Sequence, residues 1–128
     1  MGASEGFTPR LSVVTVVRNA VGTIDRCLDS MDAQTGGPWE HLVMDGASTD
    51  GTLQRLLCRE REGRILHSAP DGGLYDALNK GFARARGEIL GLLHADDVWA
   101  HPGVLERVAQ VFENPSVQAL CGDLEYVA

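Results

Sequence analysis

The sequence is poor in cysteine and has no apolar run long enough to cross a membrane. Its cysteines, Cys27, Cys58 and Cys121, are odd in number and far apart, and none forms a CxxC pair. This pattern favours free thiols in a reducing compartment over a disulfide framework. No stretch approaches the roughly 18 apolar residues of a transmembrane helix. We therefore expect a cytoplasmic domain, with any membrane association arising from regions outside this sequence.

Basic residues are also scarce. Eleven Lys and Arg stand against eighteen Asp and Glu, which gives a formal net charge of −7. A nucleic-acid surface needs clustered Lys and Arg to neutralise phosphates, so no nucleic acid is expected as a partner. A single bound nucleotide remains compatible with this balance, because a metal ion can offset its charge.

Several well-known signatures are missing. There is no Walker A sequence and no GxGxxG, which disfavours a P-loop NTPase and a standard dinucleotide-binding domain. GxSxG and HExxH are absent too, and the four histidines lack paired metal-ligand spacing. Any active site must therefore be sought in other patterns.

What the sequence does contain is a regular alternation of short apolar runs and helical stripes. Its 128 residues suit one domain, for which we expect residues 1–9 to be a disordered leader and residues 10–128 the folded part. The predicted strands are 11–17, 39–44, 64–67, 89–93 and 116–122. The alternation predicts an α/β fold, a mostly parallel, Rossmann-like sheet with helices on both faces. Ligands of such sheets bind beyond the carboxyl ends of the strands.

Polar residues follow the second and third predicted strands. Asp45 comes directly after the second strand, and the following "GASTDG" predicts a turn in which Ser48 or Thr49 caps a short helix. Such a cap leaves Asp45 unexplained. The position of Asp45 is equally consistent with a structural role and with ligand contact. After the third strand, Asp71 and Asn79 supply more polar groups than a turn needs, which favours a functional role.

The fourth strand ends in "HADD", residues 94–97. Mg²⁺ is commonly held by one or two carboxylates together with substrate phosphates, and Asp96 and Asp97 suit that use. Adjacent aspartates can also simply begin a turn. His94 lies within the same candidate site.

Taken together and in order, "LSVVTVVRNA", "VMDGASTDGT" and "SAPDGGLYDALNKGFARARGEILGLLHADD" resemble the family 2 glycosyltransferases of the GT-A fold. The resemblance runs from about residue 11 to residue 127. It implies transfer of a sugar from a nucleotide-diphosphate donor to an acceptor hydroxyl, usually with inversion and with Mg²⁺ or Mn²⁺. It further implies polysaccharide biosynthesis, with a glycan or lipid-linked acceptor.

The resemblance also implies roles for the loops after the strands. The metal would be held by Asp97, with Asp96 contacting the ribose or reaching the metal through water. The residues implied to bind the nucleotide-sugar are Val16, Val17, Arg18, Asn19, Asp45, Gly46, Asp71, Asn79 and Asp96.

The sequence departs from the family pattern at three points. Gly46 stands where many relatives carry a second acidic residue, and His94 stands where many have Asn or Asp. Family members also continue beyond the length of this sequence. We therefore expect residues 10–128 to be the donor-binding half of a C-terminally truncated domain, with the catalytic base beyond residue 128. An edge strand exposed in this way would favour a homo-oligomer.

Three other functions are compatible with parts of the pattern. A metal-dependent nucleotidyltransferase shares the sheet and the cation, but its Gly-rich basic loop is only weakly matched by "RNAVGT" at 18–23. A phosphoacceptor signalling domain would place its acidic pair after the first strand, where Arg18 and Asn19 stand. A binding-only donor domain would lack the catalytic half.

Overall fold

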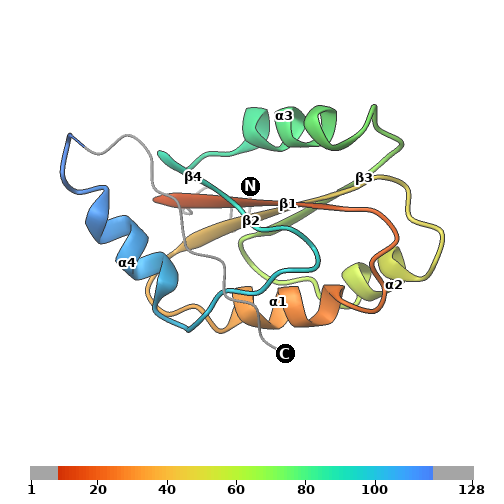
Figure 1. Cartoon of the computed structure of the whole chain (residues 1–128), viewed down its shortest axis with the longest axis horizontal. Helices are drawn as coiled ribbons and strands as arrows, with labels where there is room; N and C mark the ends of the chain where they lie inside the picture. The colour runs from red at the N-terminus through yellow and green to blue at the C-terminus, as the bar shows by residue number, and fades with distance from the viewer. Residues whose placement is uncertain (1–8, 117–128) are drawn as a thin grey trace.

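The computed structural model describes residues 9–116 and consists of a four-stranded sheet with four helices (Figure 1). The strands are β1 (Leu11–Val17), β2 (Trp39–Asp45), β3 (Arg64–Ser68) and β4 (Ile89–Leu92). The helices are α1 (Ile24–Asp32), α2 (Thr52–Leu57), α3 (Leu74–Arg84) and α4 (Val104–Val111). No helix between residues 9 and 116 has the length and apolar character that a membrane span requires.

All neighbouring strands of the sheet are parallel, in the order β3-β2-β1-β4. This confirms the predicted parallel α/β fold. The predicted fifth strand, 116–122, lies outside the described residues except for Ser116, and residues 1–8 of the expected leader also lie outside them. Pro9, the last residue of that leader, is described and is buried.

Helices cover both faces of the sheet, with α3 on one face and α1, α2 and α4 on the other (Figure 1). Alternation along β1 explains this: Val13 and Val17 pack towards α1, whereas Val14 packs towards α3. A run of β-branched residues buried on both sides is the expected sequence of a central parallel strand. The helix α3 lies close to the sheet at Gly81, where a Cβ atom would come within 2.6 Å of the Val14 side chain.

A buried carboxylate near the amino ends of the strands joins β1, β2 and the start of β4. Glu40 has no exposed surface, and its Oε1 accepts hydrogen bonds from Ser12 Oγ at 2.8 Å and from Arg86 N at 2.9 Å. The Arg86 Nε–H donates to Glu40 Oε2 at 2.7 Å. Ser12 Oγ in turn accepts from Gly87 N at 2.8 Å. This network fixes the connection that leads from α3 into β4.

Candidate functional site

The carboxyl ends of β1 and β4 enclose the cavity that best fits the predicted site. In the order β3-β2-β1-β4, these two strands flank the point where the chain changes direction across the sheet, which is where open α/β sheets bind ligands. The cavity has a volume of about 430 Å³. Its lining comes from residues 16–20, at the end of β1 and just after it, from Gly22 and Thr23, and from residues 94–96 after β4. Four of the predicted nucleotide-site residues, Val16 to Asn19, and Asp96 therefore meet in one place.

Arg18 supplies the positive charge of this cavity. It is exposed, and within residues 9–116 its guanidinium has no hydrogen-bond or ion-pair partner. An unpaired guanidinium can bind phosphate oxygens in a bidentate manner. The position of Arg18 thus suits the diphosphate of a nucleotide.

Asn19 holds the loop after β1 against the loop after β2. Its own backbone is in the left-handed region, with φ of 52°, a conformation that Asn adopts more readily than most residues. Its side-chain Oδ1 accepts from Thr49 N at 2.7 Å, and its backbone N–H donates to Ser48 Oγ at 2.9 Å. The next backbone N–H groups, those of Ala20 and Val21, donate to Thr52 Oγ1 and Asp50 Oδ2. The two loops are therefore fixed in position without a ligand.

These contacts correct the predicted helix cap. The residue before α2 is Gly51, with φ of 103°, and neither Ser48 nor Thr49 caps the helix. Their hydroxyls bond to Asp45 and Asn19 instead, and Asp50 Oδ1 accepts from Thr52 N at 3.0 Å. A bond from Thr52 Oγ1 to Asp50 holds the pKa of that carboxyl below its usual value. The prediction was wrong because α2 begins only at Thr52, after Gly51, so Ser48 and Thr49 lie too far before the helix to cap it.

Asp45 lies at the end of β2 and is only 2% exposed. Ser48 Oγ donates to its Oδ1 at 2.5 Å, and Ser68 Oγ, at the end of β3, donates to its Oδ2 at 2.7 Å. Ser48 N also donates to Oδ2 at 3.1 Å. Contact between Asp45 and a ligand stays a prediction, but in this structure each carboxylate oxygen already accepts at least one hydrogen bond and the side chain joins the ends of β2 and β3.

Asp96 and Asp97 follow β4 in a turn closed by a bond from Asp97 N to His94 O at 3.0 Å. Both side chains are exposed, and no group in the described part of the chain pairs with either carboxylate. They therefore fit a hard divalent cation, which prefers oxygen ligands. Residues 9–116 hold no group of three or more His, Cys, Asp and Glu side chains that could bind a metal alone. Within the described residues, Asp96 and Asp97 would therefore need further ligands such as phosphate oxygens or water.

Other candidate residues lie around this site without joining the cavity. Asn79 is exposed on α3 and does not line the cavity between β1 and β4. Lys80, interpreted from the sequence as part of a solvated face, pairs with Asp76 at 3.0 Å and is 45% exposed. Cys27 lies beneath the site, where its thiol donates to His94 O at 3.6 Å. Burial raises the pKa of the Cys27 thiol to about 11, so it is a neutral buried group and no nucleophile.

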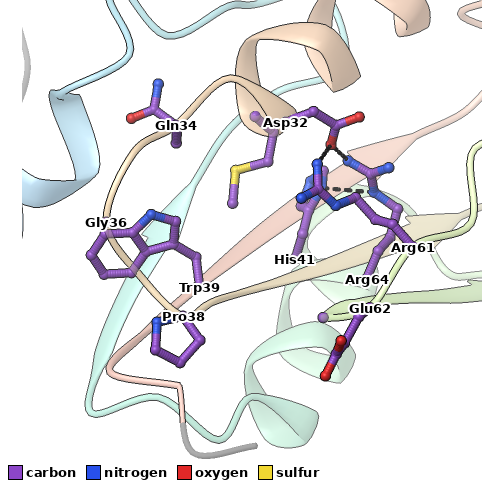
Figure 2. Close-up of a pocket in the computed structure, with 11 residues that line it drawn as sticks. Asp32, Gln34, Gly36, Pro38, Trp39, His41, Arg61, Glu62 and Arg64 are labelled. Carbon is purple, nitrogen blue, oxygen red and sulfur yellow. Dashed lines mark hydrogen bonds and ion pairs between the residues drawn. The ribbon is translucent and has the colours of Figure 1, made fainter. Parts of the chain in front are cut away.

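A second cavity, of about 350 Å³, lies at the opposite edge of the sheet, where β2 begins at Trp39 and β3 at Arg64 (Figure 2). Asp32 forms ion pairs there with Arg59 and Arg61, each at 2.9 Å, and with the buried Arg64. Despite the opposing effect of burial, the hydrogen bonds from these arginines lower the pKa of Asp32. Each of these arginines is thus already paired with Asp32, so none of them offers an unpaired guanidinium to an anionic ligand in this cavity.

A parallel sheet with paired loops, an unpaired arginine and free carboxylates at its switch point defines an α/β domain with a candidate ligand site where open α/β sheets bind their ligands. Comparison with known proteins identifies the family of this domain. The family model of glycosyl transferase family 2 matches residues 12–127. The chain belongs to this family.

Curated relatives agree with the family assignment. The chain is 40% identical over 103 residues to an uncharacterized glycosyltransferase of Mycobacterium tuberculosis, covering 80% of this chain and 39% of that protein. It is 38% identical over 104 residues to a PGL/p-HBAD biosynthesis glycosyltransferase of Mycobacterium bovis, covering 79% of this chain and 41% of that protein. The chain thus spans about two fifths of the length of these relatives.

Solved structures confirm the GT-A fold. A mannosyltransferase from Pyrobaculum calidifontis, in complex with GDP-Man and Mn²⁺, matches with a TM-score of 0.77 and 28% identity, over 87% of this chain and 34% of that one. TarS of S. aureus, in complex with UDP-GlcNAc, matches with a TM-score of 0.75 and 25% identity, over 81% of this chain and 31% of that one. Nucleotide-sugars are bound in both neighbours.

Proposed function

We propose that this domain binds a nucleoside-diphosphate sugar through a divalent cation, Mg²⁺ or Mn²⁺, for transfer of the sugar to an acceptor hydroxyl with inversion. The observation that carries the proposal is the cavity between β1 and β4, where unpaired Arg18 and the free carboxylate of Asp96 lie together, next to Asp97. The donors bound by the two neighbouring structures, and the Mn²⁺ in one of them, support it. The biosynthetic name of the M. bovis relative supports a glycan or lipid-linked acceptor.

Each part of the site has a physical task in this reaction. The oxygen of the acceptor hydroxyl attacks the anomeric carbon as its proton passes to a base, and the bond between that carbon and the diphosphate breaks. Negative charge therefore grows on the leaving nucleoside diphosphate, and a cation bound there would supply Lewis-acid stabilisation. Asp97 and Asp96 would hold that cation. Arg18 can bind a phosphate oxygen directly, and Asn19 keeps the loop in the conformation that presents it.

The family assignment separates this function from two others that the sequence left open. A nucleotidyltransferase and a phosphoacceptor domain would each belong to a different family from the one that matches residues 12–127. A binding-only donor domain can be distinguished from an active transferase by experiment. Nucleotide-sugar that is bound tightly, but neither hydrolysed nor transferred, would identify that case.

Calorimetric titration of the 128-residue chain with UDP-GlcNAc and GDP-mannose, in Mn²⁺ and in EDTA, tests the proposal. We expect at least one donor to bind in Mn²⁺ and to lose affinity in EDTA. Asp97→Asn should weaken binding in Mn²⁺ by roughly 10-fold or more, because an amide is a poorer ligand than a carboxylate for a hard cation. Circular dichroism should stay unchanged, since this side chain has no partner in the described fold.

The matched control is Asp29→Asn, which changes another exposed aspartate, on α1, whose carboxylate pairs with Arg59. It should leave donor affinity and metal dependence unchanged. If the wild-type chain binds neither donor in Mn²⁺, the proposal fails. If Asp97→Asn binds donor as the wild type does, the cation is held elsewhere.

A further inference from the structure

Gly46 and Asp71 lie against each other at the carboxyl end of β2. A Cβ atom placed on Gly46 would come within 2.7 Å of Asp71 Oδ2, so any side chain at this position would collide with that carboxylate. The φ of Gly46 lies outside the left-handed region, so backbone conformation does not require glycine here. The glycine instead provides space, and the Asp71 carboxylate occupies it. Gly46 N also donates to Val17 O at 2.9 Å, which places this contact beside the end of β1.

Asp71 keeps one carboxylate oxygen free. Its Oδ1 accepts from Gly73 N at 3.0 Å, which fixes the side chain in the turn before α3. No donor within the described range contacts Oδ2, and Asp71 is only partly exposed. By contrast, both oxygens of the neighbouring Asp45 already accept hydrogen bonds from Ser48 and Ser68. Of the two acids, Asp71 is therefore the one with an oxygen available to a ligand.

The position of this oxygen relative to the proposed cation site determines which part of the donor it meets. Asp96 and Asp97 follow β4, and Gly46 follows β2, with β1 between these two strands. Two strand spacings are roughly 10 Å. A nucleoside diphosphate whose phosphates lie at β4 and Arg18 can extend over the end of β1 and bring its base to β2.

We propose that Asp71 is a specificity-determining residue that accepts a hydrogen bond from a ring N–H of the donor's nucleobase. This inference rests on the proposed function and names the class of base that the site selects, a base with a ring N–H. An ionised carboxylate only accepts hydrogen bonds, so it matches the ring N–H of uracil or guanine. Cytosine and adenine present a ring nitrogen lone pair at the corresponding position, which the carboxylate repels. Gly46 keeps the carboxylate in place by leaving its space open.

The test compares the affinities of UDP and CDP, and of GDP and ADP, for the full 128-residue chain in Mn²⁺ by calorimetry. The wild type should prefer UDP over CDP, or GDP over ADP, by roughly 10-fold or more. In Asp71→Asn that ratio should fall to within about threefold, because a carboxamide can donate as well as accept. Dependence on Mn²⁺ should remain. Gly46→Ala should lower the ratio too, although Asp71 is still present, because the added Cβ displaces its carboxylate.

Asp76→Asn is the matched control, since Asp76 is a neighbouring carboxylate that bonds to Gly72 N and Lys80. It should keep the wild-type ratio. If Asp71→Asn weakens all four nucleotides equally, Asp71 only shapes the loop and the inference is overturned, while metal-dependent binding still supports the proposed function. A wild type that binds nucleotides in Mn²⁺ without preference for a base overturns it as well. If no nucleotide binds at all, the proposed function fails first.

Discussion

His41 is a buried histidine whose ring must stay neutral in the folded chain. Arg64 Nε donates to its Nδ1 at 3.3 Å, and its Nε2 lies 2.7 Å from Thr15 Oγ1. Burial, and after it the positive charge of Arg64, lowers the pKa of His41 to about 3. A proton on Nδ1 would both break the bond from Arg64 and place two positive charges side by side.

This depressed pKa predicts a loss of stability in mild acid. In the unfolded chain a histidine has a pKa near 6.5. Above that pH both states are neutral, and the full contribution to stability is present. As pH falls from 6.5 towards 3, only the unfolded chain takes up the proton, so the unfolding free energy should fall by up to about 1.4 kcal/mol per pH unit.

Urea unfolding at pH values from 7.5 to 5 measures this slope. The variant His41→Gln, which has no titrating group at this position, should be less stable at pH 7.5 but should show a flatter profile. The arginines lower the pKa of Asp32 against the effect of burial. The stabilising contribution of Asp32 is therefore fully present in this pH range and is lost only at lower pH, below the usual pKa of a carboxyl group. A flat wild-type profile, or an unchanged slope in the variant, would contradict the role given to His41.

For individual residues, the sequence patterns predicted where polar residues gather better than they predicted the partner of each one. They predicted that Arg18, Asn19 and Asp96 lie near one another, and the structure places all three around one cavity, because parallel strands bring their carboxyl ends to one edge. They could not show that Asp45 is enclosed by Ser48 and Ser68, since the second contact spans 23 positions in the chain. Nor could they show that Gly46 makes room for Asp71, which is a contact between two loops.

Among the elements, the connection from α3 to β4 depends most on a single buried charge. Glu40 accepts three hydrogen bonds, and two of them come from Arg86, 46 positions away. Glu40→Gln replaces one carboxylate oxygen by an amide NH₂ group that cannot accept from Arg86 Nε–H. We expect it to lower the unfolding free energy by about 2–3 kcal/mol, since hydrogen bonds to charged groups are stronger than neutral ones.

The exposed Glu88, just before β4, provides the control. Glu88→Gln should change the unfolding free energy by less than about 0.5 kcal/mol in the same urea titration, because its side chain is in solvent. Equal effects of the two substitutions would show that the Glu40 network adds nothing to stability.

Strands and helices were the most predictable features of this chain, for a physical reason. Val13, Val14 and Val17 are close in sequence, and their spacing alone tells which face of β1 each one covers. Networks such as the one at Glu40 went unpredicted because their partners lie on different strands. A polar residue in an apolar strand indicates only that some partner must exist.

At the scale of the whole fold, the sheet formed within residues 9–116 ends at β4, an edge strand with exposed apolar side chains. Within residues 9–116, β4 pairs with β1 alone. The side chains of Leu90 and Leu92 are 50% and 39% exposed, because α3 packs over β1 and β2 rather than over β4. An open edge strand with apolar side chains favours pairing with another chain.

We therefore expect this 128-residue chain to associate, with an apparent mass that rises with concentration in light scattering. Leu90→Lys should reduce association, because a charged side chain at a strand edge opposes pairing with a second copy. The control Leu57→Lys changes a comparably exposed leucine, 52% exposed at the end of α2, that lies away from a strand edge. If Leu57→Lys reduces association as much as Leu90→Lys, general surface apolarity is responsible rather than the edge. A wild-type chain that stays monomeric at high concentration would show that the β4 edge does not drive self-association.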